Sequence, residues 1–150
     1  MKLEAYLDFD GRCEEAAQFY QQALDARIEA VMRFSEAPAD ANMECGENPE
    51  MAMPPGSENK IMHMCMRIGE TMIMASDGYC KGNPQFAGIS LTLSVADDAQ
   101  AQTTFDRLAE GGKVQMPLAK TFFASSFGMV ADRFGVSWIV IAGAEQAGQA

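Results

Sequence analysis

Apolar and polar side chains alternate at the start of the chain, from residue 3 to residue 9. The apolar positions of this stretch are Leu3, Ala5, Leu7 and Phe9. A period of two predicts a β-strand with one face on a core. Over residues 11–24 the apolar positions recur every three or four residues, which predicts an amphipathic helix with Asp10 as its N-cap. Residues 27–34 alternate again and predict a second strand, with Ile28, Ala30, Met32 and Phe34 on one face.

A long segment without periodicity follows, residues 36–59, and it is rich in proline and acidic residues. Segments of this kind are either disordered or lids over a site, and we favour disorder. Residues 61–68 and 71–76 then predict a hairpin that turns at Gly69 and Glu70. One face of its first strand carries Met62, Met64 and Met66. We interpret this stripe as core packing, with a pocket wall that adapts to ligands as the alternative.

The same order of elements occurs a second time. Leu3, Leu7 and Phe19 correspond to Ile89, Leu93 and Phe105, and GETMIMAS corresponds to GVSWIVIA. The second helix is expected to begin at a cap on Asp97 or Asp98 and to stop at Gly111 and Gly112. The chain is therefore predicted to be a single domain, residues 1–150, made of two copies of strand-helix-strand-strand-strand, about 1–78 and 86–143.

Charge and cysteine content narrow the function. The formal charge is −10 and the 11 basic residues form no cluster, so nucleic acid is not an expected partner. No apolar run approaches the roughly 18 residues of a membrane span, and the start MKLEAYLDFDG lacks the features of a signal peptide, so we expect a cytoplasmic protein that does not bind membranes. The four cysteines contain no CxxC pair, which predicts buried thiols instead of a zinc knuckle or redox motif.

Four segments resemble the PhnB-like branch of the vicinal oxygen chelate superfamily, which includes glyoxalase I, extradiol dioxygenases, and bleomycin and fosfomycin resistance proteins. They are YLDFDGRCEEAAQFYQQAL, MHMCMRIGETMIMASD, LAEGGKVQMPL and TFFASSFGMVADRFGVSW. The resemblance spans nearly the whole chain apart from residues 36–59 and the last half-dozen. It implies an α+β fold in which two βαβββ modules form an eight-stranded, U-shaped mixed sheet around a ligand cavity, often with a divalent metal.

In the metal enzymes of the superfamily, the resemblance implies His, Gln or Glu ligands on the first and fourth strands of each module. Glu4 falls at such a position on the first strand, and Ser90 or a neighbour does so in the second module. The fourth strands offer Met72, Met74 or Ser76, and Trp138 or Ile139. A catalytic metal needs about three protein ligands, and one carboxylate is too few. We expect a degenerate metal site and no cofactor, and we interpret His63, the only histidine, as a structural or polar pocket group.

The side chains expected to line the cavity are aromatic or soft and apolar, with a few polar groups among them. The candidates are Glu4, Tyr6, Asp8, His63, Arg67, Phe122, Phe123 and Trp138. A lining of this kind suits a small organic ligand. Glu4 and Asp8 are also a candidate acid-base pair, or simply two exposed acids on one strand. The favoured prediction is a protein that binds a small aromatic or cationic compound.

Two alternatives remain open. One is a metal-dependent lyase, isomerase or dioxygenase built around Glu4 and His63, which rests on superfamily analogy. The other is an interaction protein that acts through its homodimer, and a homodimer is expected in every case. Members of the branch often carry a label that names a demethylubiquinone methyltransferase. The sequence does not support that chemistry, because it has no strand followed by a glycine-rich loop and helix of a doubly wound sheet.

Overall fold

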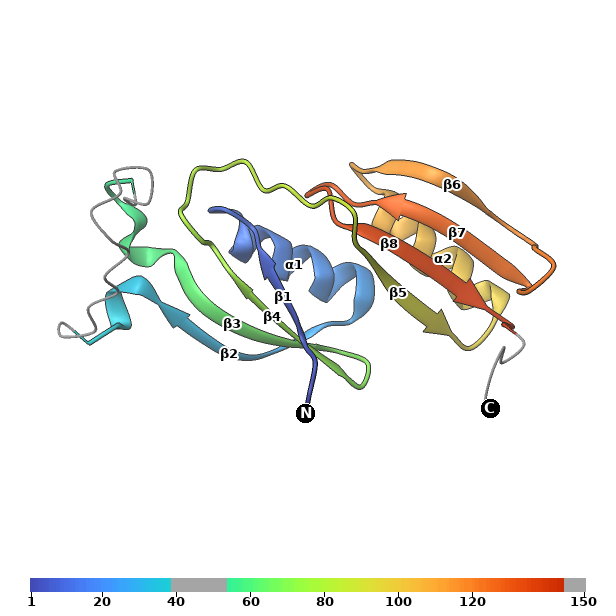
Figure 1. The fold of residues 1–150 in the computed structure, drawn as a ribbon, viewed down its shortest axis with the longest axis horizontal. Helices are drawn as coiled ribbons and strands as arrows, with labels where there is room; N and C mark the ends of the chain where they lie inside the picture. The colour runs from blue at the N-terminus through green and yellow to red at the C-terminus, as the bar shows by residue number, and fades with distance from the viewer. Residues whose placement is uncertain (39–53, 145–150) are drawn as a thin grey trace. The chain divides into compact units, whose positions relative to one another are not determined.

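The computed structural model describes residues 1–38 and 54–144, and the chain forms two compact units, Met1–Pro84 and Gln85–Ala150 (Figure 1). Most of the segment predicted to be disordered or a lid, residues 39–53, lies outside the described residues. Within the described ranges, no helix is both long enough and apolar enough to cross a membrane.

The first unit consists of one helix and a four-stranded sheet. Its elements are β1 (Ala5–Asp8), α1 (Cys13–Leu24), β2 (Arg27–Arg33), β3 (Ile61–Ile68) and β4 (Thr71–Ser76), with short 3-10 turns at Phe34–Glu36 and Ser57–Asn59. The strand order is β1-β4-β3-β2, in which β1 runs parallel to β4 and the other neighbours are antiparallel. The predicted hairpin is confirmed at both strands. The first strand is shorter than the alternation predicted, and Leu3 is exposed.

The second unit repeats this plan. Its elements are β5 (Ser90–Val95), α2 (Asp98–Ala109), β6 (Lys113–Ala119), β7 (Ser126–Ala131) and β8 (Ser137–Ala142). The strand order is β5-β8-β7-β6, with β5 parallel to β8 and antiparallel pairs elsewhere. The shared order and directions confirm the predicted duplication and the α+β class.

The core of the first unit lies between α1 and one face of its sheet (Figure 1). Met64 and Met66 of β3 are buried there with Tyr20 of α1. This confirms the prediction of core packing for Met64 and Met66, a role that suits the flexible thioether side chain, whereas Met62 is only half-buried. The opposite face, which we call the open face of the first sheet, carries Tyr6, Met74 and the residues of β3 that alternate with the methionines.

Strand β2 does not keep a single apolar face, contrary to the predicted alternation. Ile28 lies opposite Met66, whereas Ala30 lies opposite Cys65, with a register shift between them. The shift leaves Glu29 as an extra residue, and a β-bulge of this kind reverses the faces of the residues that follow. Ile28 and Ala30 therefore lie on different faces of the sheet.

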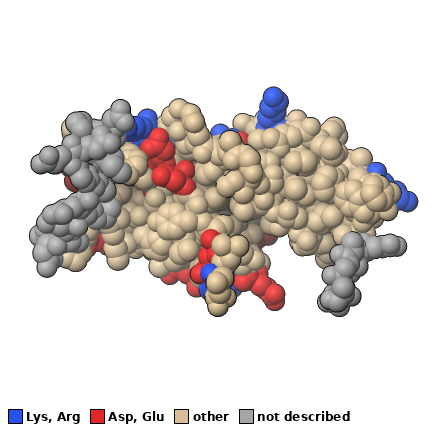
Figure 2. Space-filling model, viewed as in Figure 1, with Lys and Arg blue, Asp and Glu red and all other residues tan. Residues whose placement is uncertain are grey.

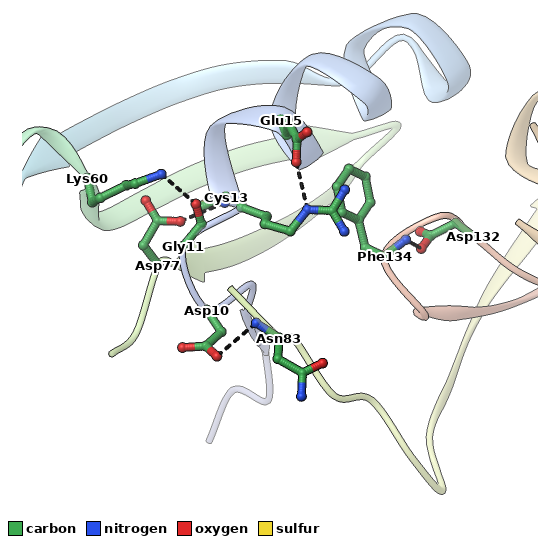
Figure 3. Close-up of polar contacts among 10 residues, drawn as sticks. Asp10, Gly11, Cys13, Glu15, Lys60, Asp77, Asn83, Asp132 and Phe134 are labelled. Atoms are coloured by element: carbon green, nitrogen blue, oxygen red, sulfur yellow. Dashed lines mark hydrogen bonds and ion pairs between the residues drawn. The ribbon is translucent and has the colours of Figure 1, made fainter. Parts of the chain in front are cut away.

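Helix α1 begins two residues later than predicted, and Asp10 is not its cap. The residue before the helix is Arg12, whose side chain makes no capping hydrogen bond. The cap comes from Asp77, the residue after β4, whose Oδ1 accepts from the backbone N–H of Cys13 at 2.6 Å (Figure 3). Asp77 Oδ2 also accepts from the N–H of Ile61 at 2.6 Å. Asp10 instead accepts from the N–H groups of Lys81 and Asn83.

Helix α2 begins as predicted, with Asp97 as its N-cap and Asp97 Oδ1 accepting from the N–H of Gln100 at 2.7 Å. The next residue, Asp98, accepts hydrogen bonds from the hydroxyls of Ser125 and Ser126 just before and at the start of β7. These two hydrogen bonds lower the pKa of Asp98. They therefore stabilise the fold at neutral pH, and this contribution is lost as the pH falls through the folded-state pKa.

Substituting Ser126 with alanine is expected to raise the pKa of Asp98, because one of the two donors to its carboxylate is removed. Carboxyl 13C NMR titration measures this change directly. The control is Thr103→Ala, which removes a hydroxyl that bonds only to the carbonyl of Ala99 within α2. An unchanged Asp98 titration in S126A would contradict the assignment.

The turn between β7 and β8 is organised by one buried carboxylate, that of Asp132. Its Oδ1 accepts from the backbone N–H of Phe134 (Figure 3) and of Val136, and its Oδ2 accepts from Trp138 Nε1 at 2.8 Å. Gly135 has a φ of +89° in this turn, a backbone conformation that glycine adopts without strain. The hairpin and the tryptophan are thus fixed by the same side chain.

Candidate small-molecule site

A hollow of about 420 Å³ lies within the second unit, beside the start of β5 and of β8. It is lined by Phe86, Ala87, Gly88, Ile89, Ser90, Gln115, Met129, Gly135 and Ser137. This volume is in the range of ligand pockets, which are mostly apolar with a few placed polar groups. The hollow opens on the face of the sheet opposite α2, because Ser137 and Met129 alternate with the buried residues Trp138 and Val130.

Three polar side chains of this lining form a hydrogen-bonded chain. Ser90 Oγ donates to Ser137 Oγ at 2.9 Å, and Ser137 Oγ donates to Gln115 Oε1 at 2.9 Å. The parallel pairing of β5 with β8 places the two serines opposite each other. Gln115 lies at a register shift in β6, and such bulges re-aim side chains beside sites. The amide NH2 of Gln115 and the serine oxygens supply donors and acceptors for a bound molecule.

No lining residue of the hollow is charged. Figure 2 shows that charged side chains are also sparse over much of the face in view, although the chain has a formal charge of −10. The pocket therefore offers hydrogen bonds and apolar contact without a counter-charge, which favours a neutral ligand.

The first unit brings together two of the predicted residues, Tyr6 and His63. The hydroxyl of Tyr6 lies 3.1 Å from His63 Nδ1, and the ring centroids are 5.6 Å apart. Cys65 Sγ lies 3.4 Å from His63 Nε2. Both nitrogens of the only histidine are therefore engaged on the open face of the first sheet, and Tyr6 is 50% exposed there.

The other predicted residues of the first unit have separate partners. Glu4 forms an ion pair with Lys2 at 2.7 Å, and Asp8 accepts from the backbone N–H of Asp10. Arg67 donates to Glu29 at 2.5 Å, and this hydrogen bond raises the pKa of Arg67 and lowers that of Glu29. Among the described residues Glu4 and Asp8 have different partners, and their role as an acid-base pair stays a prediction.

The predicted aromatic residues of the second unit do not line the hollow. Trp138 is 1% exposed and lies in the core, because its side chain leaves β8 on the face that packs against α2. Its expected position on a cavity wall is therefore corrected. Phe122 is 99% exposed and stacks edge-on against Phe123, which in turn contacts Phe127. These three rings form a separate aromatic cluster before and within β7.

The side chains at the expected metal positions do not fit a divalent ion. Glu4, the expected ligand on the first strand, is paired with Lys2. The other expected positions hold Met74 on β4, Ser90 on β5 and Ile139 on β8. Thioether, hydroxyl and alkyl groups are poor ligands for such metals, so one carboxylate remains where about three ligands are needed. In residues 1–38 and 54–144, no three His, Cys, Asp or Glu side chains are grouped so that they could hold a metal ion.

Sequence reasoning missed Ser137 and Gln115, and its prediction of buried thiols is wrong for Cys65 and Cys80, which are partly exposed. A signal for Ser137 was present, because it alternates with Trp138 on a strand and must lie on the face opposite the tryptophan. No comparable signal exists for Gln115, since a bulge sets its direction.

Comparison with known proteins identifies relatives over almost the full length. The family model described as 3-demethylubiquinone-9 3-methyltransferase matches residues 1–141. Protein YjdN of Escherichia coli (strain K12) is 34% identical over 140 residues, covering 93% of this chain and 94% of that protein. The crystal structure of PA1353 from Pseudomonas aeruginosa is 38% identical, with a TM-score of 0.77 and coverage of 97% and 99%. The putative 3-demethylubiquinone-9 3-methyltransferase, PhnB protein, from Bacillus cereus is 28% identical, with a TM-score of 0.73 and coverage of 95% and 99%.

More distant structures share the fold alone. A glyoxylase/bleomycin resistance protein/dioxygenase domain from Frankia sp. EAN1pec is 15% identical, with a TM-score of 0.59 and 94% coverage of both chains. The fosfomycin resistance protein FosX from Mesorhizobium loti is 10% identical, with a TM-score of 0.60 and coverage of 94% and 90%. The family model matches residues 1–141, so the chain belongs to the family described as 3-demethylubiquinone-9 3-methyltransferase, and its duplicated βαβββ topology is the fold that it shares with these more distant structures.

Proposed function

We propose that this protein binds a small, neutral organic molecule in the hollow of the second unit and acts as a binding protein with a degenerate metal site. The observation that carries the proposal is the 420 Å³ hollow with the Ser90–Ser137–Gln115 hydrogen-bonded chain on its wall. A ligand that covers this wall gains hydrogen bonds from the chain and apolar contact with Phe86, Ile89 and Met129. The absence of charge in the lining favours a neutral compound over the cationic one also considered from the sequence.

The open face of the first sheet is the second surface that we propose for contact with small molecules. It carries Tyr6 and His63, with the ion pair of Arg67 and Glu29 nearby on β3 and β2.

We also expect the protein to be cytoplasmic and to form a homodimer. Light scattering at micromolar concentration tests the homodimer. The methyltransferase activity in the family description is not part of the proposal, because neither sheet is the doubly wound parallel sheet usual for binding S-adenosylmethionine.

A thermal-shift screen against neutral aromatic and hydroxylated heterocycles is the direct test. A compound at 100 times its Kd stabilises the protein by about 2.7 kcal/mol and should appear as a saturable rise in Tm. Complete absence of such a compound up to millimolar concentration would refute the proposal.

The variant Ser137→Ala is expected to weaken binding of any such compound by about 3- to 10-fold, the worth of one hydrogen bond. Isothermal titration calorimetry measures this change. The matched control is Ser94→Ala, because Ser94 is an exposed serine of β5 outside the lining and its variant should bind as the wild type does. Equal weakening in both variants would place the ligand elsewhere.

A further inference from the structure

The open face of the first sheet, proposed above as a second surface for small molecules, carries a chain of three reactive side chains outside the hollow of the second unit. Tyr6 Oη, His63 Nδ1, His63 Nε2 and Cys65 Sγ are linked by contacts of 3.1 Å and 3.4 Å. Cys65 and His63 are two residues apart on β3 and so share a face, and Tyr6 reaches them from β1 across β4. All three are at least partly exposed, and none belongs to the core against α1.

This geometry is that of a nucleophile with an oriented base. When His63 Nδ1–H donates to the phenol oxygen of Tyr6, the lone pair of Nε2 faces the thiol and accepts its proton. After the transfer both ring nitrogens carry hydrogen, and the same two contacts hold the imidazolium between the phenol and the thiolate. A nucleophile within reach of a base that a third group orients is the usual arrangement of activated thiols.

The other cysteines of the described residues lack this environment. Cys13 is fully buried, and burial together with the carboxylate of Asp77 raises its pKa. Cys80 is partly exposed like Cys65, but its Sγ faces the carbonyl of Gly78, and burial raises its pKa. Cys80 is therefore an internal reference for a partly exposed thiol without a histidine partner, and because its pKa is raised, the His63 variant decides whether the histidine activates Cys65.

We propose that Cys65 is a nucleophile that captures electrophilic small molecules of the α,β-unsaturated carbonyl class, with His63 as its base and Tyr6 as the residue that orients the base. The thiol proton moves to His63 Nε2 as the sulfur forms a bond to the β-carbon. The carbon-carbon π bond breaks and its electrons pass to the carbonyl as an enolate. The proton then returns from His63 to the α-carbon, leaving a thioether and a neutral histidine.

The surroundings of Cys65 on this face suit an apolar electrophile. Its cross-strand neighbours are Met74 on β4 and Ala30 on β2. The charged groups on this face are Arg67, which is paired with Glu29, and Arg27, which lies opposite Arg67 on β2. Asp8 lies at the end of β1, and Glu4, which is paired with Lys2, lies just before β1. The thiol is therefore set among soft apolar groups, with its nearest titratable contact being His63.

N-ethylmaleimide is the probe, and peptide mapping by mass spectrometry gives the rate at each cysteine of the intact full-length protein. At pH 7 the Cys65 peptide is expected to react about tenfold faster than the Cys80 peptide, because an unassisted thiol is only a few per cent ionised there. Equal rates at the two cysteines would overturn the proposal.

Variants of His63 and Tyr6 show whether proton transfer or mere exposure of the thiol makes Cys65 reactive. His63→Gln should slow the reaction of Cys65 about tenfold at pH 7, and the difference should disappear near pH 10, where ordinary thiols ionise without a base. Tyr6→Phe should slow it about threefold, the worth of one orienting hydrogen bond. The control is Met32→Leu, since Met32 lies opposite His63 on β2 and offers no proton acceptor.

Far-UV circular dichroism confirms that each variant is folded. If His63→Gln does not fold, Tyr6→Phe carries the test, because an exposed tyrosine that loses only its hydroxyl keeps the packing of the ring. If Cys65 in Tyr6→Phe or in His63→Gln reacts at the wild-type rate, the proposed role of the replaced residue is contradicted. Slowing in Met32→Leu equal to that in His63→Gln would show that surface packing, and not proton transfer, sets the rate.

Discussion

Replacing Asp77 with alanine is expected to lower the free energy of unfolding by about 3–5 kcal/mol, because hydrogen bonds to a buried charged group are worth about 1.5–3 kcal/mol each. Asp77 is 1% exposed, and its two oxygens accept from the backbone N–H groups of Cys13 and Ile61. Alanine leaves both donors inside the protein without their acceptor. It also removes the negative charge from the N-terminus of α1, where the helix dipole favours it.

Urea unfolding followed by far-UV circular dichroism measures the loss in D77A. The matched control is Glu15→Gln, which removes an acid from the first turn of the same helix where it forms only an exposed ion pair with Arg12. That change should cost less than about 1 kcal/mol. A D77A protein as stable as E15Q would show that the carboxylate does not hold the helix end.

Replacing Asp132 with alanine should destabilise the protein by a similar amount, about 3–5 kcal/mol, which is the usual cost of removing one member of a buried charged network. Asp132 is 3% exposed and accepts from Phe134, Val136 and the indole of Trp138. Trp138 is the only tryptophan, so its fluorescence reports on the surroundings of the altered residue. We expect the urea midpoint by fluorescence to fall and the native emission to shift to the red as water approaches the indole.

A double-mutant cycle with Trp138→Phe separates the indole bond from the two backbone bonds, with circular dichroism as the signal. The coupling energy between the two positions is expected to be about 1–3 kcal/mol. The control is Asp106→Asn, on the exposed face of α2, where the carboxylate accepts only from the Gln102 side chain. Additive effects of D132A and W138F would mean that the indole bond contributes nothing to stability.

The sequence predicted the order and type of the elements well, because one side of each helix and strand is buried and the apolar period follows that side. The hairpin at Gly69 is an example, with both strands where the alternation placed them. The cap of α1 was predicted wrongly, since local sequence offers Asp10 beside the helix, whereas the carboxylate in use comes from Asp77 after β4. Only the tertiary fold brings that residue to the helix end.

The candidate site was less predictable. Side chains alternate between the two faces of a strand, and a bulge changes that alternation, so small errors in register decide which residues share a face. Tyr6 and His63 were predicted as pocket residues, and the structure joins them by a hydrogen bond, although their role in binding stays a prediction. Trp138 was assigned to the wrong face, and its neighbour Ser137 is on the wall of the hollow. Successive side chains of a strand point to opposite faces of the sheet. An error of one residue in the register therefore assigns a core residue to the pocket and a pocket residue to the core.

The parallel pair of β1 with β4 has a consequence for synthesis on the ribosome. Ala5 lies opposite Ile73, so the first strand leaves the exit tunnel long before its partner has been translated. Helix α1 likewise waits for Asp77, which follows β4 directly. The nascent first unit can therefore complete its sheet and its helix cap only after β4 and Asp77 have emerged, although its first strand and helix emerge much earlier.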